Sequence, residues 1–157
     1  MKAATISELK TELGNSSPAQ LLELCVRLAK FKKENKELIT YLLFESFDEN
    51  AWIENIKMEM QEQFKEINKT SLYFVKKSLR KILRLTNKYI RYTGSADAEV
   101  RLLLFFCTTL KASGIPFQTS PVINNIYQNQ LKKISKTIAT MHEDLQYDYV
   151  KELKLLS

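Results

Sequence analysis

The sequence contains little glycine and little proline. With only three of each in 157 residues, it lacks the turn residues that a sheet-rich fold with many tight connections requires. Hydrophobic residues make up 45% of the chain and charged residues 27%, which is ordinary for a globular domain and unlike a disordered one. We therefore expect an ordered, helical protein.

Residues for several kinds of catalysis are also scarce. His142 is the only histidine, and the two cysteines do not form a C-x-x-C pair. Glycines this sparse do not make a glycine-rich phosphate loop. His142, Glu143 and Asp144 stand together, but adjacent helical residues diverge by about 100° and do not converge on one metal ion. We predict no catalytic residue, no metal and no cofactor, with a helical enzyme around His142 kept as a remote alternative.

No apolar run is long enough to cross a bilayer. The longest is LLLFFC, and the N-terminal stretch MKAATISELKTELG contains none, so we expect neither a signal peptide nor stable membrane insertion. Cys25 and Cys107 lie in apolar surroundings, where cysteines act as small reduced hydrophobic residues. These observations favour a cytoplasmic location.

Helix boundaries are well marked. Gly14, Gly94 and Gly114 stand where helical patterns stop, and Pro18 and Pro121 each follow a serine that suits a helix N-cap. Two pairs fit the capping box, Thr5 with Glu8 and Ser17 with Gln20, and three further N-caps are Asn35, Asp48 and Ser95. These signals predict helices near residues 6–13, 18–32, 36–46, 49–66, 70–92, 96–112 and 121–155.

Short links between these helices predict the architecture. Neighbouring helices joined by a few residues pack antiparallel, so we expect one all-α domain over residues 1–157, a compact antiparallel bundle of six to seven helices. The hairpins of the N-terminal half resemble the layout of helical-repeat proteins of the HEAT and armadillo kind, although no repeated signature accompanies them. Whether 49–66 and 70–92 are one continuous helix is left open, because no glycine or proline separates them.

The width of each apolar face predicts its burial. Helices 18–32 and 96–112 are apolar over much of their circumference, so we expect both inside the bundle. Helix 49–66 has a one-sided apolar stripe and an acidic back that carries Glu54, Glu59, Glu62 and Glu66. It should therefore lie on the outside.

Helix 70–92 combines an apolar face with an uncompensated basic one. No acid occurs from Ile67 to Ala96, a segment with eight of the 24 basic residues. The other 16 basic residues face 18 acids, so the formal charge of +6 comes from this segment alone. The residues that we predict to bind a partner, called the basic face from here on, are Lys76, Lys77, Arg80, Lys81, Arg84, Lys88 and Arg91, with Tyr73 in the same arc.

Like charges at adjacent helical positions repel each other, so an uncompensated basic face indicates an anionic partner. The competing interpretation is a solvated face, or one neutralised by the acidic back of helix 49–66. Nucleic acid is possible, although only Tyr73 and Asn87 offer stacking or amide groups and no known nucleic-acid-binding signature is present. A membrane-surface helix is disfavoured, because its apolar face is needed for the core.

The last helix carries a heptad-like seam. Apolar residues recur at steps of four and three, at Leu131, Ile134, Ile138, Met141 and Leu145. Such a seam packs inside the same bundle or pairs with another chain as a homodimer. Taken together, the sequence predicts a non-enzymatic interaction module that binds an anionic or helical protein partner, with nonspecific nucleic-acid binding through helix 70–92 as the alternative.

Overall fold

The computed structural model describes all residues 1–157, and the chain is entirely helical, as predicted. It contains eight α-helices rather than six to seven. Contacts divide the chain into two compact units, Met1–Phe44 (unit 1) and Glu45–Ser157 (unit 2), and each is described by itself. The single domain predicted from the sequence stays a prediction.

Unit 1 consists of three short helices, α1 (Ile6–Gly14), α2 (Pro18–Phe31) and α3 (Lys33–Thr40). A π-helical turn, η1 (Tyr41–Glu45), follows α3 across the unit boundary. Both predicted capping boxes form, at Thr5 with Glu8 and at Ser17 with Gln20. α2 packs against α3 as a hairpin, which follows from the very short link between them.

Two expectations about unit 1 are wrong. α2 has no buried residue, because three short helices are too few to enclose it, and Cys25 is accordingly exposed. The expected N-cap Asn35 lies inside α3, which begins at Lys33. Its side-chain amide instead donates to the carbonyl of Leu28 at 2.8 Å and so joins the two helices of the hairpin.

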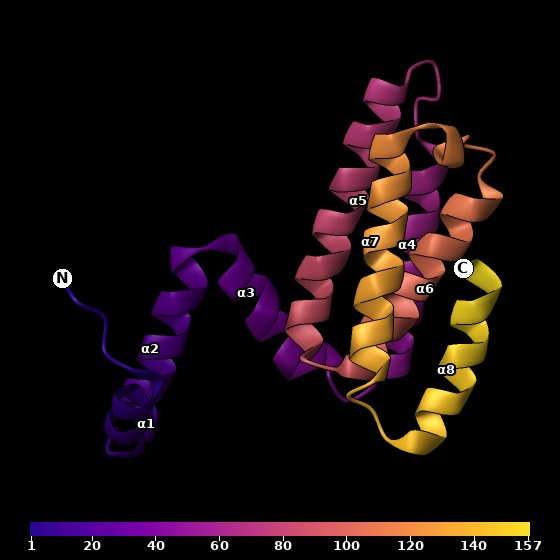
Figure 1. The fold of residues 1–157 in the computed structure, drawn as a ribbon. Coiled ribbons are helices and arrows are strands. Elements are labelled where there is room, and N and C mark those ends of the chain that lie inside the picture. The colour runs from indigo at the N-terminus through magenta and orange to yellow at the C-terminus, as the bar shows by residue number, and fades with distance from the viewer. The chain divides into compact units, whose positions relative to one another are not determined.

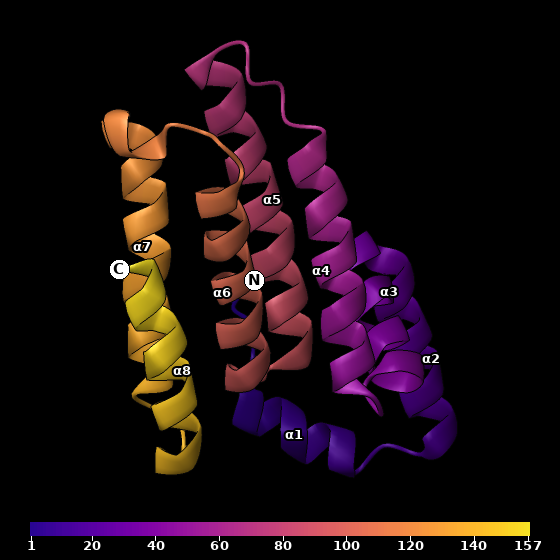
Figure 2. The ribbon, with the colours of Figure 1, turned by 90° about the vertical axis from the view of Figure 1, so that its right-hand side faces the viewer.

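Unit 2 consists of five α-helices and a 3₁₀ turn. Their bounds are α4 (Glu49–Lys65), α5 (Leu72–Thr93), α6 (Ala96–Ala112), η2 (Phe117–Thr119), α7 (Pro121–Ile138) and α8 (Glu143–Leu156). Figures 1 and 2 show α4 to α7 running up and down, with α8 beside α6 and α7. α4 and α5 are separate antiparallel helices, which answers the question of continuity. The side-chain oxygen of Ser71 caps the start of α5.

The core of unit 2 surrounds α6, which contacts each of the other four helices. α6 contributes eight buried residues, so the prediction that it lies inside is confirmed. α4 turns its stripe of Ile53, Ile56, Met60 and Phe64 inward and keeps its acidic back exposed, as expected for an outer helix. Phe117 of η2 packs against Tyr127 with ring centroids 4.7 Å apart and closes one end of the core.

The predicted last helix, 121–155, is wrong, because the chain reverses over residues 139–142 and forms two helices, α7 and α8. The hydroxyl of Thr140 donates to the carbonyl of Thr137 at 2.7 Å, and His142 caps α8 by accepting from the N–H of Asp144. The reversal lets Leu156 enter the core, where its carbonyl accepts a hydrogen bond from Tyr127 at 2.6 Å. We infer that the free energy gained by packing α8 on the bundle exceeds the free energy that one continuous helix would gain from its extra backbone hydrogen bonds.

Candidate anion-binding surface

Two caps and one apolar face fix the orientation of α5. The hydroxyl of Ser71 accepts from the N–H of Phe74 at its start, and Gly94 ends it in the left-handed conformation with φ 62°. The buried residues are Val75, Leu79, Ile82, Leu83, Thr86, Ile90 and Tyr92. Because these side chains face α4 and α6, the basic residues between them in the sequence are turned outward.

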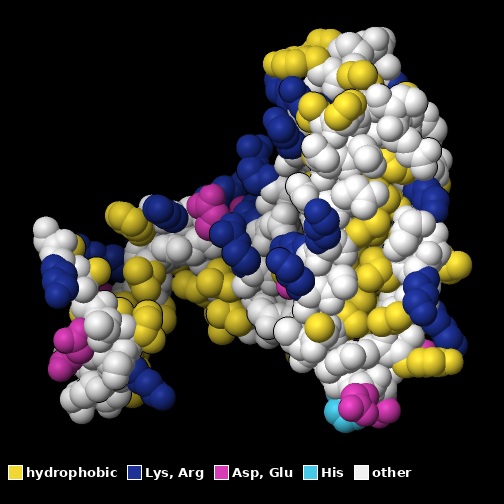
Figure 3. Space-filling view, viewed as in Figure 1, with side chains coloured by type: hydrophobic (Ala, Val, Ile, Leu, Met, Phe, Trp, Pro, Cys, Tyr) yellow, Lys and Arg dark blue, Asp and Glu magenta, His cyan; other side chains and the backbone are white.

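Five cations of the basic face are exposed. These are Lys77, Arg80, Lys81, Arg84 and Arg91, whereas Lys76 and Lys88 are half-buried. In the space-filling view of Figure 3, Lys and Arg side chains follow one another down the α5 side of unit 2. The predicted site residues therefore share one continuous surface.

The exposed cations are not neutralised by the acids of α4. None of the five forms an ion pair. Glu54 pairs instead with Lys57 at 2.9 Å and with Arg101 at 3.3 Å. The hydrogen bond from Lys57 is the main reason why the pKa of Glu54 lies below its ordinary value.

Two other acids on the back of α4 have partners within the same helix. Glu62 pairs with Lys65 at 2.6 Å, and Glu59 accepts from the side-chain amide of Gln63 at 3.1 Å. The acids of α4 therefore form no ion pairs with the five exposed cations. The competing interpretation, in which α4 neutralises them, is wrong.

Aromatic rings order the two half-buried lysines. The amine of Lys76 lies 5.7 Å from the ring centroid of Tyr73, and that of Lys88 lies 5.1 Å from the ring centroid of Tyr89. Both distances suit a cation–π contact. Tyr73 itself is 61% exposed and continues the line of cations at the N-terminal end of α5.

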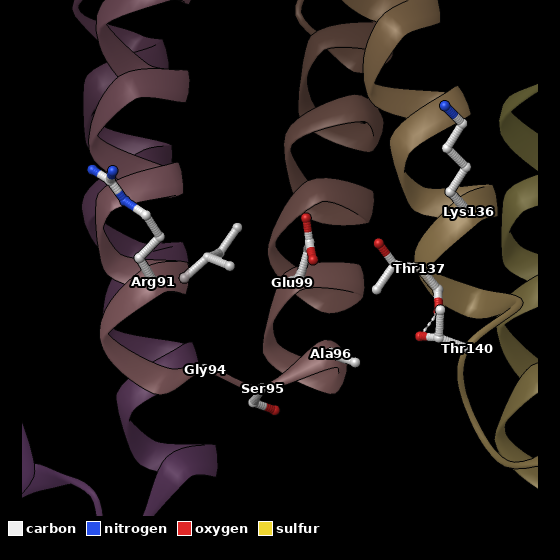
Figure 4. Close-up of a pocket in the computed structure, with 9 residues that line it drawn as sticks. Arg91, Gly94, Ser95, Ala96, Glu99, Lys136, Thr137 and Thr140 are labelled. Carbon is white, nitrogen blue, oxygen red and sulfur yellow. Dashed lines mark hydrogen bonds between the residues drawn. The ribbon is translucent and has the colours of Figure 1, made fainter. Parts of the chain in front are cut away.

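An open cleft of about 590 Å³ adjoins the basic face where α5 ends, α6 begins and α7 ends. Figure 4 shows Arg91 and Lys136 on opposite sides of it, with Glu99 between them. Glu99 is paired with Lys133 at 2.7 Å. The cleft therefore extends the basic face towards α7.

Sequence reasoning missed the contribution of α7. The amine of Lys133 donates to the side-chain oxygen of Asn87 on α5 at 2.8 Å, which links α7 to α5. Both helices pack against α6, and Lys136 lines the same cleft as Arg91. The segment LKKISK is visibly basic, but its position relative to α5 depends on the packing of the whole unit.

The predicted seam does not lie on one continuous helix. Leu131, Ile134 and Ile138 are buried in the core of unit 2, Met141 lies half-buried in the reversal, and Leu145 begins α8 as an exposed residue. The helix period that generated the seam ends at residue 138. The first three residues therefore pack inside their own bundle.

His142 is exposed and lines neither the cleft beside Arg91 nor a second cleft beside Arg101 and Tyr149. Its Nδ1 accepts from the N–H of Asp144 at 3.3 Å. The chain has no group of three or more histidine, cysteine or acidic residues placed to hold a metal ion.

A cluster of polar side chains joins α8 to α6. The hydroxyl of Tyr149 donates to Asp97, and Arg101 reaches Asp97 at 3.4 Å and Asn50 at 2.7 Å. Burial, followed by the hydrogen bond to Asp97, raises the pKa of Tyr149. These contacts tie three helices together, and we assign the cluster a structural role.

No family model, no curated protein and no solved structure matches this chain. None of its helices is long and apolar enough to cross a membrane.

Proposed function

We propose that the chain is a non-enzymatic interaction module that binds a phosphate-bearing anionic macromolecule through the basic face of α5. The observation that supports this proposal is the coexistence of exposed, unpaired cations with an apolar face that is buried in the core from Val75 to Tyr92. A cation that stabilised the fold would contact an acid, and Lys77, Arg80, Lys81, Arg84 and Arg91 do not.

The geometry suits a regular array of negative charges. From Lys77 to Arg91 the face extends over 14 residues, or about 21 Å along the helix axis. A rigid helix holds its cations at fixed spacing, so binding several phosphates requires little further ordering of the backbone. Long side chains with free ends then adapt to the positions of the individual phosphates.

A short DNA duplex serves as a test array of phosphates. If about five phosphates are contacted, the logarithm of the association constant should fall with the logarithm of salt concentration at a slope of about −4. Fluorescence anisotropy of a labelled duplex at several salt concentrations measures this slope. Absence of binding at low salt, both to the duplex and to vesicles of anionic lipid, would rule out the proposal.

A pair of charge reversals localises the contact. Arg80→Glu with Arg84→Glu should weaken binding strongly and reduce the slope by about two, since each lost phosphate contact removes about one unit. The matched control is Lys151→Glu with Lys154→Glu on α8, which changes net charge equally at exposed positions outside the basic face. Equal weakening by both pairs would mean that net charge, and not this face, determines binding.

A further inference from the structure

The first turn of α5 carries three apolar residues that the core does not use. Leu72, Tyr73 and Phe74 are 50%, 61% and 44% exposed, whereas Val75, the next residue, is buried. We call Leu72, Tyr73 and Phe74 the apolar tip. Figures 1 and 2 show that this turn rises beyond the ends of α6 and α7, and apolar side chains cover that end of the molecule in Figure 3.

The apolar tip is structured. Ser71 caps the helix immediately before it, the rings of Tyr73 and Phe74 meet edge to face at 5.5 Å, and Lys76 lies over the ring of Tyr73. Lys69, in the adjoining loop, donates to the carbonyl of Ser113 at 2.6 Å, which ties this loop to the end of α6. Exposed apolar side chains held in a fixed position indicate a binding surface.

Cations follow the apolar tip directly. Lys77 and Lys81 come four and eight residues after Tyr73, about 6 Å and 12 Å along the helix axis. The headgroup layer on each side of a bilayer is about 5–8 Å thick. When the apolar tip reaches the hydrocarbon boundary, Lys77 lies at the level of the phosphates. The flexible side chain of Lys81 extends from the next turn back towards them.

The acids at this end leave the cations available. At this end α4 carries Glu62, which pairs with Lys65 at 2.6 Å, and Glu66, the C-cap residue, which forms no ion pair with Lys77 or Lys81. α5 itself carries no acid. The local charge is therefore positive and suits an anionic surface.

From the apolar tip and the cations behind it, we infer that the partner is an anionic lipid surface, to which the chain binds reversibly. This inference rests on the proposed function, since the basic face supplies the attraction. Three successive helical residues diverge by about 100° each, so they do not fit together into one groove of a protein. A fluid bilayer interface surrounds a projecting helix end on all sides, and tyrosine favours that interface. Adsorption of this kind uses only the apolar tip and leaves the core intact. The apolar face of α5 that packs in the bundle therefore does not have to leave it.

The test compares vesicles of phosphatidylcholine alone with vesicles that contain about a third phosphatidylserine, the anionic lipid. Sedimentation of the full chain with each kind of vesicle measures its partition coefficient. We expect binding only to the anionic vesicles. Lys77→Glu with Lys81→Glu should lower the coefficient at least twentyfold, because each cation near such a surface contributes about fivefold.

The apolar contribution is tested separately. Leu72→Ser with Tyr73→Ser should lower the partition coefficient about tenfold while the urea midpoint stays unchanged, since both side chains are exposed. The matched control is Tyr147→Ser with Leu155→Ser on α8. Tyr147 is 65% exposed and lies under Lys151 as Tyr73 lies under Lys76, but it is remote from the basic face. The control pair should bind as the unchanged chain does.

A polarity-sensitive fluorophore reports insertion directly. It is attached to the cysteine of Tyr73→Cys in a Cys25→Ser background, with Tyr147→Cys as the comparison. Cys107 is fully buried, and burial raises the pKa of its thiol to about 12, so it does not compete for the label. We expect a blue shift on anionic vesicles at position 73 only.

Three results would overturn the inference. If the double variant Leu72→Ser with Tyr73→Ser keeps the partition coefficient of the unchanged chain, and no blue shift occurs at position 73, the chain adsorbs by charge alone. Salt-dependent duplex binding without any vesicle binding means that the partner is a nucleic acid and the proposed function stands. Failure to bind either probe removes the inference and the proposed function together.

Discussion

Phe106→Ala should destabilise unit 2 severely, because Phe106 is 0% exposed and its ring meets that of Phe64 at 5.4 Å. Truncating a buried phenylalanine costs about 3–5 kcal/mol, from lost transfer free energy and from the cavity left behind. With a urea dependence of about 2 kcal/mol per molar, the unfolding midpoint should fall by about 2 M.

The comparison is Leu28→Ala on α2. The sequence pattern places both residues inside the bundle, but the structure leaves Leu28 47% exposed. A half-exposed leucine in an open hairpin should cost about 1 kcal/mol or less.

The assay uses the only tryptophan, Trp52 on α4, which packs against the core of unit 2. Its fluorescence follows unfolding of unit 2 during urea titration, and far-UV circular dichroism follows the whole chain. The reasoning is refuted if Leu28→Ala lowers the tryptophan midpoint as much as Phe106→Ala does, or if Phe106→Ala lowers it by less than about 0.5 M.

Further predictions concern the exposed Arg84, the Tyr149 hydrogen bond and the burial of each helix. Arg84→Glu should change the free energy of unfolding by less than about 0.5 kcal/mol, since Arg84 is exposed and without an ion pair, and a large loss in urea titration would place the basic face inside the fold. Tyr149→Phe should cost about 1–2 kcal/mol, because the partly buried Asp97 loses the donor on α8 and keeps only Arg101; circular dichroism at several urea concentrations measures this. The raised pKa of Tyr149 means that its contribution is complete below the ordinary value of 10.0 and is lost as pH rises above it, so the unchanged protein should lose more stability at alkaline pH than Tyr149→Phe. Amide hydrogen exchange should be slowest in α6, which has eight buried residues, and fastest in α1 to α3, which have none, and equal protection would contradict the burial argument.

Sequence signals of short range predicted local features correctly. Capping boxes at Thr5 and Ser17, the N-caps Asp48 and Ser95 and the left-handed Gly94 and Gly114 all appear in the structure. Each depends on hydrogen bonds or steric limits within a few residues, so the neighbouring residues are enough to predict it. The apolar faces of α4, α5 and α6 were predictable for the same reason, since the helical period fixes which residues share a side.

The reversal after Ile138 was not predictable from periodicity. Met141 and Leu145 continue the seam in register, and residues 139–142 contain neither glycine nor proline. A weak signal existed in Glu143 and Asp144, acids that favour the first turn of a helix. The reversal places Leu156 against the bundle, a contact between residues far apart in the sequence that no local pattern indicates.

By itself, the sequence determined that the chain is helical, where most helices begin and end, and that α5 has one apolar and one basic side. These properties arise from the period of the helix and from contacts within one or two turns. The tertiary structure decided which sides water reaches. It paired Glu54 and Glu62 with cations outside the basic face and left five of the seven cations of that face exposed. It also carried Leu72, Tyr73 and Phe74 beyond the core and exposed α2. Exposure depends on how neighbouring helices dock, and docking is set by side-chain contacts between segments that no local pattern brings together.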